Sequence, residues 1–202
     1  MASFEAIFAV GTSIVAHLRN AYEQQRMDEG LPDCIFDLIS SSELARDDDR
    51  LSSVTLYLYR VSVNEHLRNR PPVQHTGVYE TPLSLDLHYL LTVWANESSQ
   101  EQRLLGWAMR HLHSNPVLDV SSLSSLGDWQ PNDVLHLVPA ELSNEDLMRI
   151  WDALTPSYRL SFSYVARVVR IDPYHYESRR SVVATRFEVG DEGLVPAGEA
   201  RP

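Results

Sequence analysis

The stretch LSLDLHYLLTVWANESSQEQRLLGWAMRHLHSN, residues Leu83 to Asn115, decides the fold. Apolar residues alternate with polar ones from Leu83 to Val93, which is the period of a β-strand with one buried face. Ser98 and Ser99 each precede a Glu or Gln by three residues, the pattern of a helix capping box. The apolar residues that follow recur at helical spacing, and Asn115-Pro116 ends the pattern. The sequence therefore predicts a long strand followed closely by a helix.

Upstream of this stretch, the sequence predicts one helix and two strands. Apolar residues at helical spacing predict a helix over residues 4–26, with Ser3 as its N-cap and with Gly30 and Pro32 beyond its end. A short strand over 34–39 and a polar loop over 40–50 follow. The strand predicted over 54–63 is apolar on both faces, which is typical of a central strand.

The connection from Asn64 to Pro82 is predicted to be a long loop, which is uncommon inside a compact domain and is usually functional. Downstream, the sequence predicts a strand over 134–138 and a helix capped by Ser143 that ends at Pro156. Alternating residues predict a long strand over 158–171 and a further edge strand over 182–189.

Consecutive strands favour antiparallel pairing, so the predicted fold class is α+β, with about four to six strands and about three helices on one face of the sheet. A chain of 202 residues is the size of one domain. We expect residues 1–190 to form that domain. Residues 191–202, which are polar and contain Pro and Gly, are expected to be a flexible tail.

Composition excludes some classes of function. The net charge is −11 and all 17 basic residues are Arg, so general binding to nucleic-acid phosphates is not expected. No apolar run reaches the ~20 residues that span a bilayer, and Glu5 within the apolar N-terminus favours a helix over an export signal. The single Cys34 suits a reducing cytoplasm, where we expect the protein to assemble.

No residue pattern indicates an enzyme, a cofactor or a metal site. Without Lys there is no P-loop, and Gly11-Thr12-Ser13 lacks the second glycine of a nucleophile elbow. His111 and His113 point apart on a helix, unlike an i, i+4 pair that can share a metal ion. His88, on the polar face of its strand, is predicted to be a hydrogen-bonded structural histidine.

Charge is distributed unevenly along the chain. Residues 23–50 contain nine carboxylates and three arginines, and residues 157–187 contain six arginines and two carboxylates. Two interpretations are open: two ordinary solvated surfaces, or opposite patches that meet between neighbouring subunits of a closed head-to-tail ring. The candidate interface residues are Asp47, Asp48, Asp49, Arg68, Arg70, His75, Arg167, Arg170, Arg179 and Arg180.

The chain also resembles a known family. The words LYLYRVSVNEHLRNRPP, LSLDLHYLLTVWA and EQRLLGWAMRHLHSNPVL are similar to the tail-terminator (cap) proteins of extracellular contractile injection systems of the antifeeding-prophage type. These systems are headless, phage-tail-like particles. The resemblance runs from about Phe4 to Arg170 and is densest between Val54 and Leu118. It implies an α+β subunit of a hexameric ring.

The resemblance implies a structural role rather than catalysis. The expected function is a cap that binds the last ring of the inner tube and of the sheath, and so ends elongation at the distal end of the particle. The expected partners are six copies of this chain, the tube protein and the sheath protein. The alternative is a monomeric α+β adaptor domain, and a small hydrolase has no supporting motif.

Overall fold

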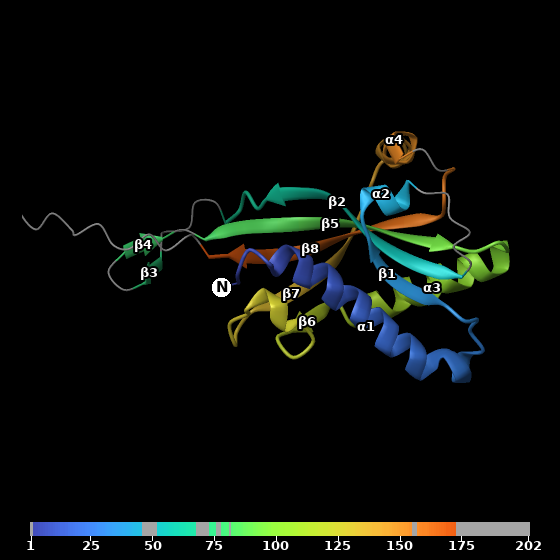
Figure 1. The fold of residues 1–202 in the computed structure, drawn as a ribbon, viewed down its shortest axis with the longest axis horizontal. Helices are drawn as coiled ribbons and strands as arrows, with labels where there is room; N and C mark the ends of the chain where they lie inside the picture. The colour runs from blue at the N-terminus through green and yellow to red at the C-terminus, as the bar shows by residue number, and fades with distance from the viewer. Residues whose placement is uncertain are drawn as a thin grey trace, which may run out of the picture.

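The structure is a computed structural model that describes residues 2–45, 52–67, 73–75, 78–80, 82–154 and 157–172, without the side chains of 73–75 and 78–80. Four α-helices, one 3₁₀ helix and eight strands follow one another in these ranges (Figure 1). The helices are α1 (Ala6–Glu29), α2 (Ser41–Leu44), α3 (Ser98–Ser114), α4 (Asn144–Leu154) and η1 (Ser125–Gly127). The strands are β1 (Ile35–Ile39), β2 (Ser53–Val63), β3 (Val73–His75), β4 (Val78–Glu80), β5 (Leu83–Trp94), β6 (Val117–Asp119), β7 (Val134–Ala140) and β8 (Ser161–Ile171).

Six of the strands form one mixed sheet in the order β1-β2-β5-β8-β7-β6. All neighbours pair antiparallel except β1 and β2, which are parallel. The predicted α+β class is therefore confirmed, but antiparallel pairing of consecutive strands is wrong for β1 and β2. Residues 40–50 were predicted to be only a loop, and they contain α2. A crossover that carries the chain back to the same end of the sheet is what parallel pairing requires.

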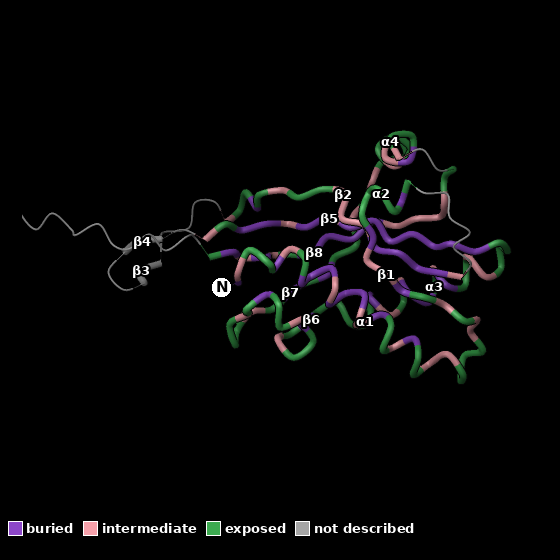
Figure 2. The backbone as a smooth tube through the Cα atoms, in the orientation of Figure 1, coloured by how far each residue is buried: buried purple, intermediate pink, exposed green. Residues whose placement is uncertain are grey.

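The predicted sequence stretch does lie at the centre of the fold. β5 pairs with β2 from Leu85 to Trp94 and with β8 on its other side. Its odd-numbered residues from Leu85 to Val93 are buried in the main core beneath α1 and α3. Figure 2 shows that burial is concentrated along β5 and along the side of α1 that faces the sheet.

Helices cover both faces of the sheet, so the prediction of a single covered face is wrong. Leu90 and Trp94, on the other face of β5, pack with Leu44 of α2 and Trp151 of α4 in a second apolar cluster. The sequence did not predict this second covered face, because α2 lies in a polar segment that has the composition of a loop. Leu44 is fully buried, and a capping box between Ser40 and Glu43 begins this short helix.

Helix α1 runs obliquely to the strands of the sheet (Figure 1). Tyr89 on β5 donates a hydrogen bond to the Ile7 carbonyl at 3.4 Å, and a Cβ at Gly11 would lie 2.8 Å from Leu38 of β1. Gly11 therefore lets the helix approach β1 closely. At its end, Gly30 adopts the left-handed conformation with φ of 59°, which ends the helix as predicted. At its start, Ser3 Oγ accepts from the Glu5 amide, but the N-cap is Glu5 and not the predicted Ser3.

Two predicted helix caps had different outcomes. The capping box at Ser98 and Ser99 is wrong, because α3 already begins at Ser98 with Glu97 as its N-cap and without a side-chain cap bond. The Ser143 cap is confirmed, since the Asp146 amide donates to Ser143 Oγ at 3.0 Å. None of the helices in these described ranges is both long and apolar enough to cross a membrane.

Three short strands were missed in the sequence. β6 pairs with β7, and β3 and β4 pair with each other in a separate two-stranded sheet within the predicted 64–82 loop. Each has three residues, too few for a period of two to be recognised. The strand predicted over 182–189, the tail predicted over 191–202 and Pro156 lie outside the described residues.

Candidate functional site

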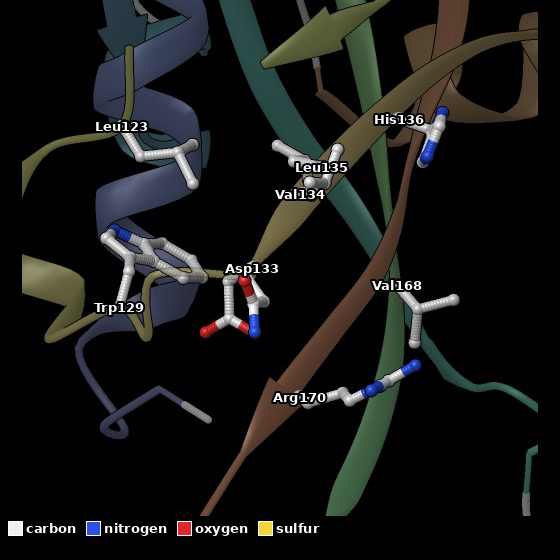
Figure 3. A pocket seen from close by; sticks show the side chains of 9 residues that line it. Leu123, Trp129, Asp133, Val134, Leu135, His136, Val168 and Arg170 are labelled. Carbon is white, nitrogen blue, oxygen red and sulfur yellow. The ribbon is translucent and has the colours of Figure 1, made fainter. Parts of the chain in front are cut away.

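The candidate site lies where β7 and β8 separate. Their pairing extends from Ala140 opposite Ser163 to His136 opposite Arg167. Beyond Arg167, β8 continues to Ile171, while β7 pairs with β6 on its other side. A pocket of about 270 Å³ fills the opening between the two strands (Figure 3). Its lining residues are Leu123, Trp129, Asn132, Asp133, Val134, Leu135, His136, Val168 and Arg170.

The N-terminal residues support the open end of β8. The Ala2 amide donates to the Arg170 carbonyl and the Asp172 amide donates to the Ala2 carbonyl, both at 2.8 Å. Ala2 is fully buried and forms a parallel bridge with Ile171. These bonds hold the end of β8 in extended conformation after β7 has diverged. They therefore fix the backbone of the pocket wall that β8 forms.

The opposite wall is held by a close contact between Gly127 and Trp129. The Trp129 indole nitrogen donates to the Ser124 carbonyl at 2.8 Å. A Cβ at Gly127 would lie 2.3 Å from the indole ring, a distance that no side chain could occupy without moving the ring. The absence of a side chain at Gly127 therefore places Trp129 in the pocket wall, because the ring occupies the space of that Cβ.

Arg170 is the only cation that lines this pocket among the described residues. Its side chain is partly buried, and no described residue offers a hydrogen bond or an ion pair to its guanidinium. Figure 3 shows Arg170 and Val168 on β8, across the opening from Val134 and Leu135 of β7. An arginine in a concave site presents a planar fork that matches a carboxylate in two hydrogen bonds.

Arg167, three residues earlier on β8, is engaged with its own subunit. Its Nε lies 4.0 Å from Asp86 Oδ2, and the Asn64 amide group donates to both oxygens of Asp86 at 3.0 Å. The Arg167 side chain is 52% exposed, so this ion pair contributes little to stability. Asp86 belongs to this end of the sheet and was not predicted from the sequence, because it is one polar residue in a regular alternation.

The other candidate interface residues are not brought together in the described part of the chain. Only the backbone of His75, in β3, is described. The remaining candidates lie outside the described residues: Asp47, Asp48, Asp49, Arg68, Arg70, Arg179 and Arg180.

The histidines have structural partners. His88 Nε2 lies 2.9 Å from Ser62 Oγ, which confirms the predicted hydrogen-bonded role, and burial lowers the pKa of His88. His111 Nε2 lies 3.0 Å from His17 Nε2, and the His111 ring stacks on Trp107. This contact joins α3 to α1. Within the described ranges, no three His, Cys, Asp or Glu side chains are placed to hold a metal ion.

The His17–His111 pair predicts a loss of stability in acid. Burial, followed by the neighbouring His17 and Arg110, lowers the pKa of His111 to about 4, and burial also lowers the pKa of His17. Because the folded-state pKa lies below the value of ~6.5 in the unfolded chain, the stabilisation is complete above pH ~6.5 and is lost as the pH falls towards 4. Both rings are partly exposed, so we expect a loss on the order of 1 kcal/mol.

Urea unfolding of wild type and His111→Gln at pH 7 and pH 4.5 measures this effect. Gln keeps a polar group beside His17 but does not titrate, so the variant should lose less stability in acid than the wild type. His113→Gln is the matched control on the same helix, because His113 is exposed. An equal loss in wild type and in His111→Gln would contradict the assignment.

Comparisons with known proteins identify a family and similar solved structures. A family model described as the Pvc16 N-terminal domain matches residues 9–185. No curated protein matches the sequence. A cryo-EM structure of the sheath/tube terminator of an extracellular contractile injection system, PVC, in its extended state, has a TM-score of 0.55 and 20% identity. The match covers 94% of this chain and 65% of that chain.

A second structure is the tube-terminating cap of the anti-feeding prophage, with a TM-score of 0.46 and 17% identity. That match covers 68% of this chain and 49% of the cap protein. The chain thus spans between about half and two thirds of the two solved proteins. At these identities, the likeness to the PVC terminator establishes the α+β fold of this chain.

Proposed function

Because the chain belongs to the family of Pvc16 N-terminal domains, we propose that it is a structural terminator of a contractile injection system. The family match over residues 9–185 is the observation that carries this proposal. In this role the chain binds the last ring of the inner tube and of the sheath and ends elongation. It acts through surface complementarity, without catalysis or a cofactor. Assembly takes place in the cytoplasm, and the protein remains at the distal end of the particle.

Termination requires two unlike ends. Tube and sheath subunits add through repeating, head-to-tail interfaces, so the polymers themselves have no stopping point. A terminator must match the last ring on one side and offer no copy of that surface on the other. We propose that six copies of this chain form a closed ring, because a head-to-tail contact whose rotation closes satisfies every interface without leaving a free end.

Arg170 and the exposed carboxylates near the C-terminal end of α1 are unlike charges that support a head-to-tail contact. The backbone of Arg170 is hydrogen-bonded to Ala2, four residues before α1 begins. The C-terminal end of α1, about 36 Å from its start at 1.5 Å per residue, carries the exposed Glu23 and Asp28. Three nearby carboxylates, Glu29, Asp33 and Asp37, are paired with arginines of the same subunit. The acidic surface available to a neighbour is therefore smaller than the sequence count suggested.

The remaining candidate residues are assigned to the two charged sides of the subunit from their positions in the sequence. Asp47, Asp48 and Asp49 extend the acidic side, and Arg179 and Arg180 extend the basic side. The connection that contains Arg68, Arg70 and His75 is proposed to contact the tube, the sheath or the next subunit, because the sheet does not need such a long connection between β2 and β5.

We expect the purified chain, alone or with tube ends, to form a ring of about six times 23.0 kDa that dissociates as the salt concentration rises. Replacing Arg170 with Glu should weaken assembly roughly tenfold, because it places a carboxylate in a site that we propose to receive one. Light scattering or analytical ultracentrifugation at several salt concentrations measures both effects.

Arg149→Glu is the matched control, since it makes the same change in charge at an exposed position of α4. Equal weakening by the two variants would contradict a specific role for Arg170 but leave the ring intact. A chain that stays at the monomer mass, even with tube ends present, would instead support the adaptor alternative.

A further inference from the structure

One edge of the sheet is only partly covered. β1 pairs with β2 from Ser53 to Tyr57 and ends there. β2 continues to Val63 and stays paired with β5 on its inner side, except at Tyr59. Among the described residues, no strand pairs with the outer side of β2 from Leu58 to Val63. Such an edge presents a row of backbone donors and acceptors that an extended chain can satisfy.

An apolar groove lies beside this edge, at the point where β1 ends. It has a volume of about 580 Å³ and lies between the start of α1 and the strands β1 and β2. Phe4 and Phe8 line it and are 73% and 54% exposed. Leu38, Leu58 and Tyr89 form other parts of its lining.

A β-bulge extends the apolar surface along the edge. The β2–β5 register shifts between Leu58 and Arg60, so Val61 and Val63 lie opposite Leu87 and Leu85. Residues directly opposite each other share a face, and Leu85 and Leu87 belong to the core beneath α1. Val61 and Val63 therefore lie on the face of the groove, where they are 45% and 50% exposed. Exposed apolar side chains beside an unpaired strand edge are typical of an interaction site.

One segment of the sequence has the properties that this site requires, namely a predicted strand with an apolar face and nearby basic residues. The strand predicted over 182–189, outside the described residues, places Val183, Phe187 and Val189 on one face with Thr185. Arg186 and Glu188 fall on the other face. Eight residues are enough to cover the six-residue edge. The arginines at 179, 180 and 186 also complement the exposed Glu5 in the lining of the groove.

We propose that residues 182–189 of a neighbouring copy of this chain add a strand to the outer edge of β2, with their apolar face in the groove. The proposal rests on the ring proposed above, and it adds a strand contact to the charged contact proposed there between neighbouring subunits. The edge and the segment are two different surfaces of one chain, which is what a head-to-tail ring requires. Main-chain hydrogen bonds give such a contact its affinity, and the apolar side chains give its register.

Disulfide linking between two differently tagged chains tests the proposal. Both chains carry Cys34→Ser. One also carries Val61→Cys, and the other carries a single cysteine at position 183, 185, 187 or 189. After mixing under oxidising conditions, we expect a linked heterodimer with at least one of the four positions, and loss of the link when a peptide with the sequence SVVATRFEV is added in excess. A chain with Arg149→Cys in place of Val61→Cys is the matched negative control.

Thr92→Cys with Ser161→Cys is the positive control, because the two side-chain oxygens lie 3.0 Å apart in the folded sheet. Links that form only within a chain carrying both Val61→Cys and the second cysteine would show that the segment covers its own edge, and would overturn the proposal. Absence of any link, with the positive control linked, would overturn it as well. Wild-type chain that still forms rings and caps tails in that case would retain the proposed function, so the two failures are distinguishable.

Discussion

Replacing Leu87 with Asp is expected to unfold the domain. Leu87 is fully buried at the centre of β5, with Val61 on one side and Ala166 on the other. A carboxylate there would have no partner, because its neighbours in the core are apolar. Leaving a charge buried and unpaired costs about 3–5 kcal/mol, a large part of the ~5–15 kcal/mol that holds a typical domain together.

Circular dichroism during heating measures this effect, and Leu83→Asp is the matched control. Leu83 lies on the same strand and the same face, but its side chain is 48% exposed. Its replacement should therefore change the melting temperature by only a few degrees. If Leu87→Asp melted like the control, the assignment of β5 as the central strand would be in error.

The sequence showed the core of this fold because its long elements have clear periods. Leu83 to Val93 alternates strictly, and the structure buries that alternation beneath α1 and α3. Helix α4 was equally clear, since Ser143 and the apolar stripe through Trp151 agree on where it begins and which side it buries. The family resemblance is confirmed by the match over residues 9–185.

The errors occurred where tertiary contacts, rather than local pattern, decide the structure. Segment 40–50 looked like a polar loop, yet Leu44 is buried against Trp94 and Trp151, which are distant in sequence. Parallel pairing of β1 with β2 depends on that segment. Ser98 and Ser99 have the spacing of a cap, but α3 has already begun at Ser98. No local pattern distinguishes these possibilities.

Two residues of the candidate site were predicted from the sequence, but the pocket was not, again because tertiary contacts form it. Arg167 and Arg170 were predicted as interface residues from charge alone. In the structure their environments differ: Arg167 lies near Asp86, whereas Arg170 lines a pocket. That pocket exists because β7 diverges from β8 and because Gly127 makes room for Trp129. Strand divergence has no signature in sequence. The unpaired edge of β2 is likewise a property of where β1 ends, which only the pairing register shows.

Removal of this chain from a particle is expected to disturb the distal end and leave the baseplate end normal. Without a terminator, the tube and sheath still present their repeating interface at the growing end, because identical subunits carry no mark of a final ring. We therefore expect tails of widely spread or abnormal length. We also expect sheaths that do not stay extended, since the distal ring of the sheath is no longer anchored to the tube.

Electron micrographs of particles from a deletion strain measure both effects, as the distribution of tail lengths and the fraction of extended sheaths. Leu87→Asp should reproduce the deletion, because an unfolded chain cannot form a ring. Replacing His88, His111 and His113 together with Gln is the matched control, since His88 lies against Ser62, His111 lies against His17 and His113 is exposed. Particles of normal length that remain extended and capped without this chain would overturn the terminator role, because such tails would end without it.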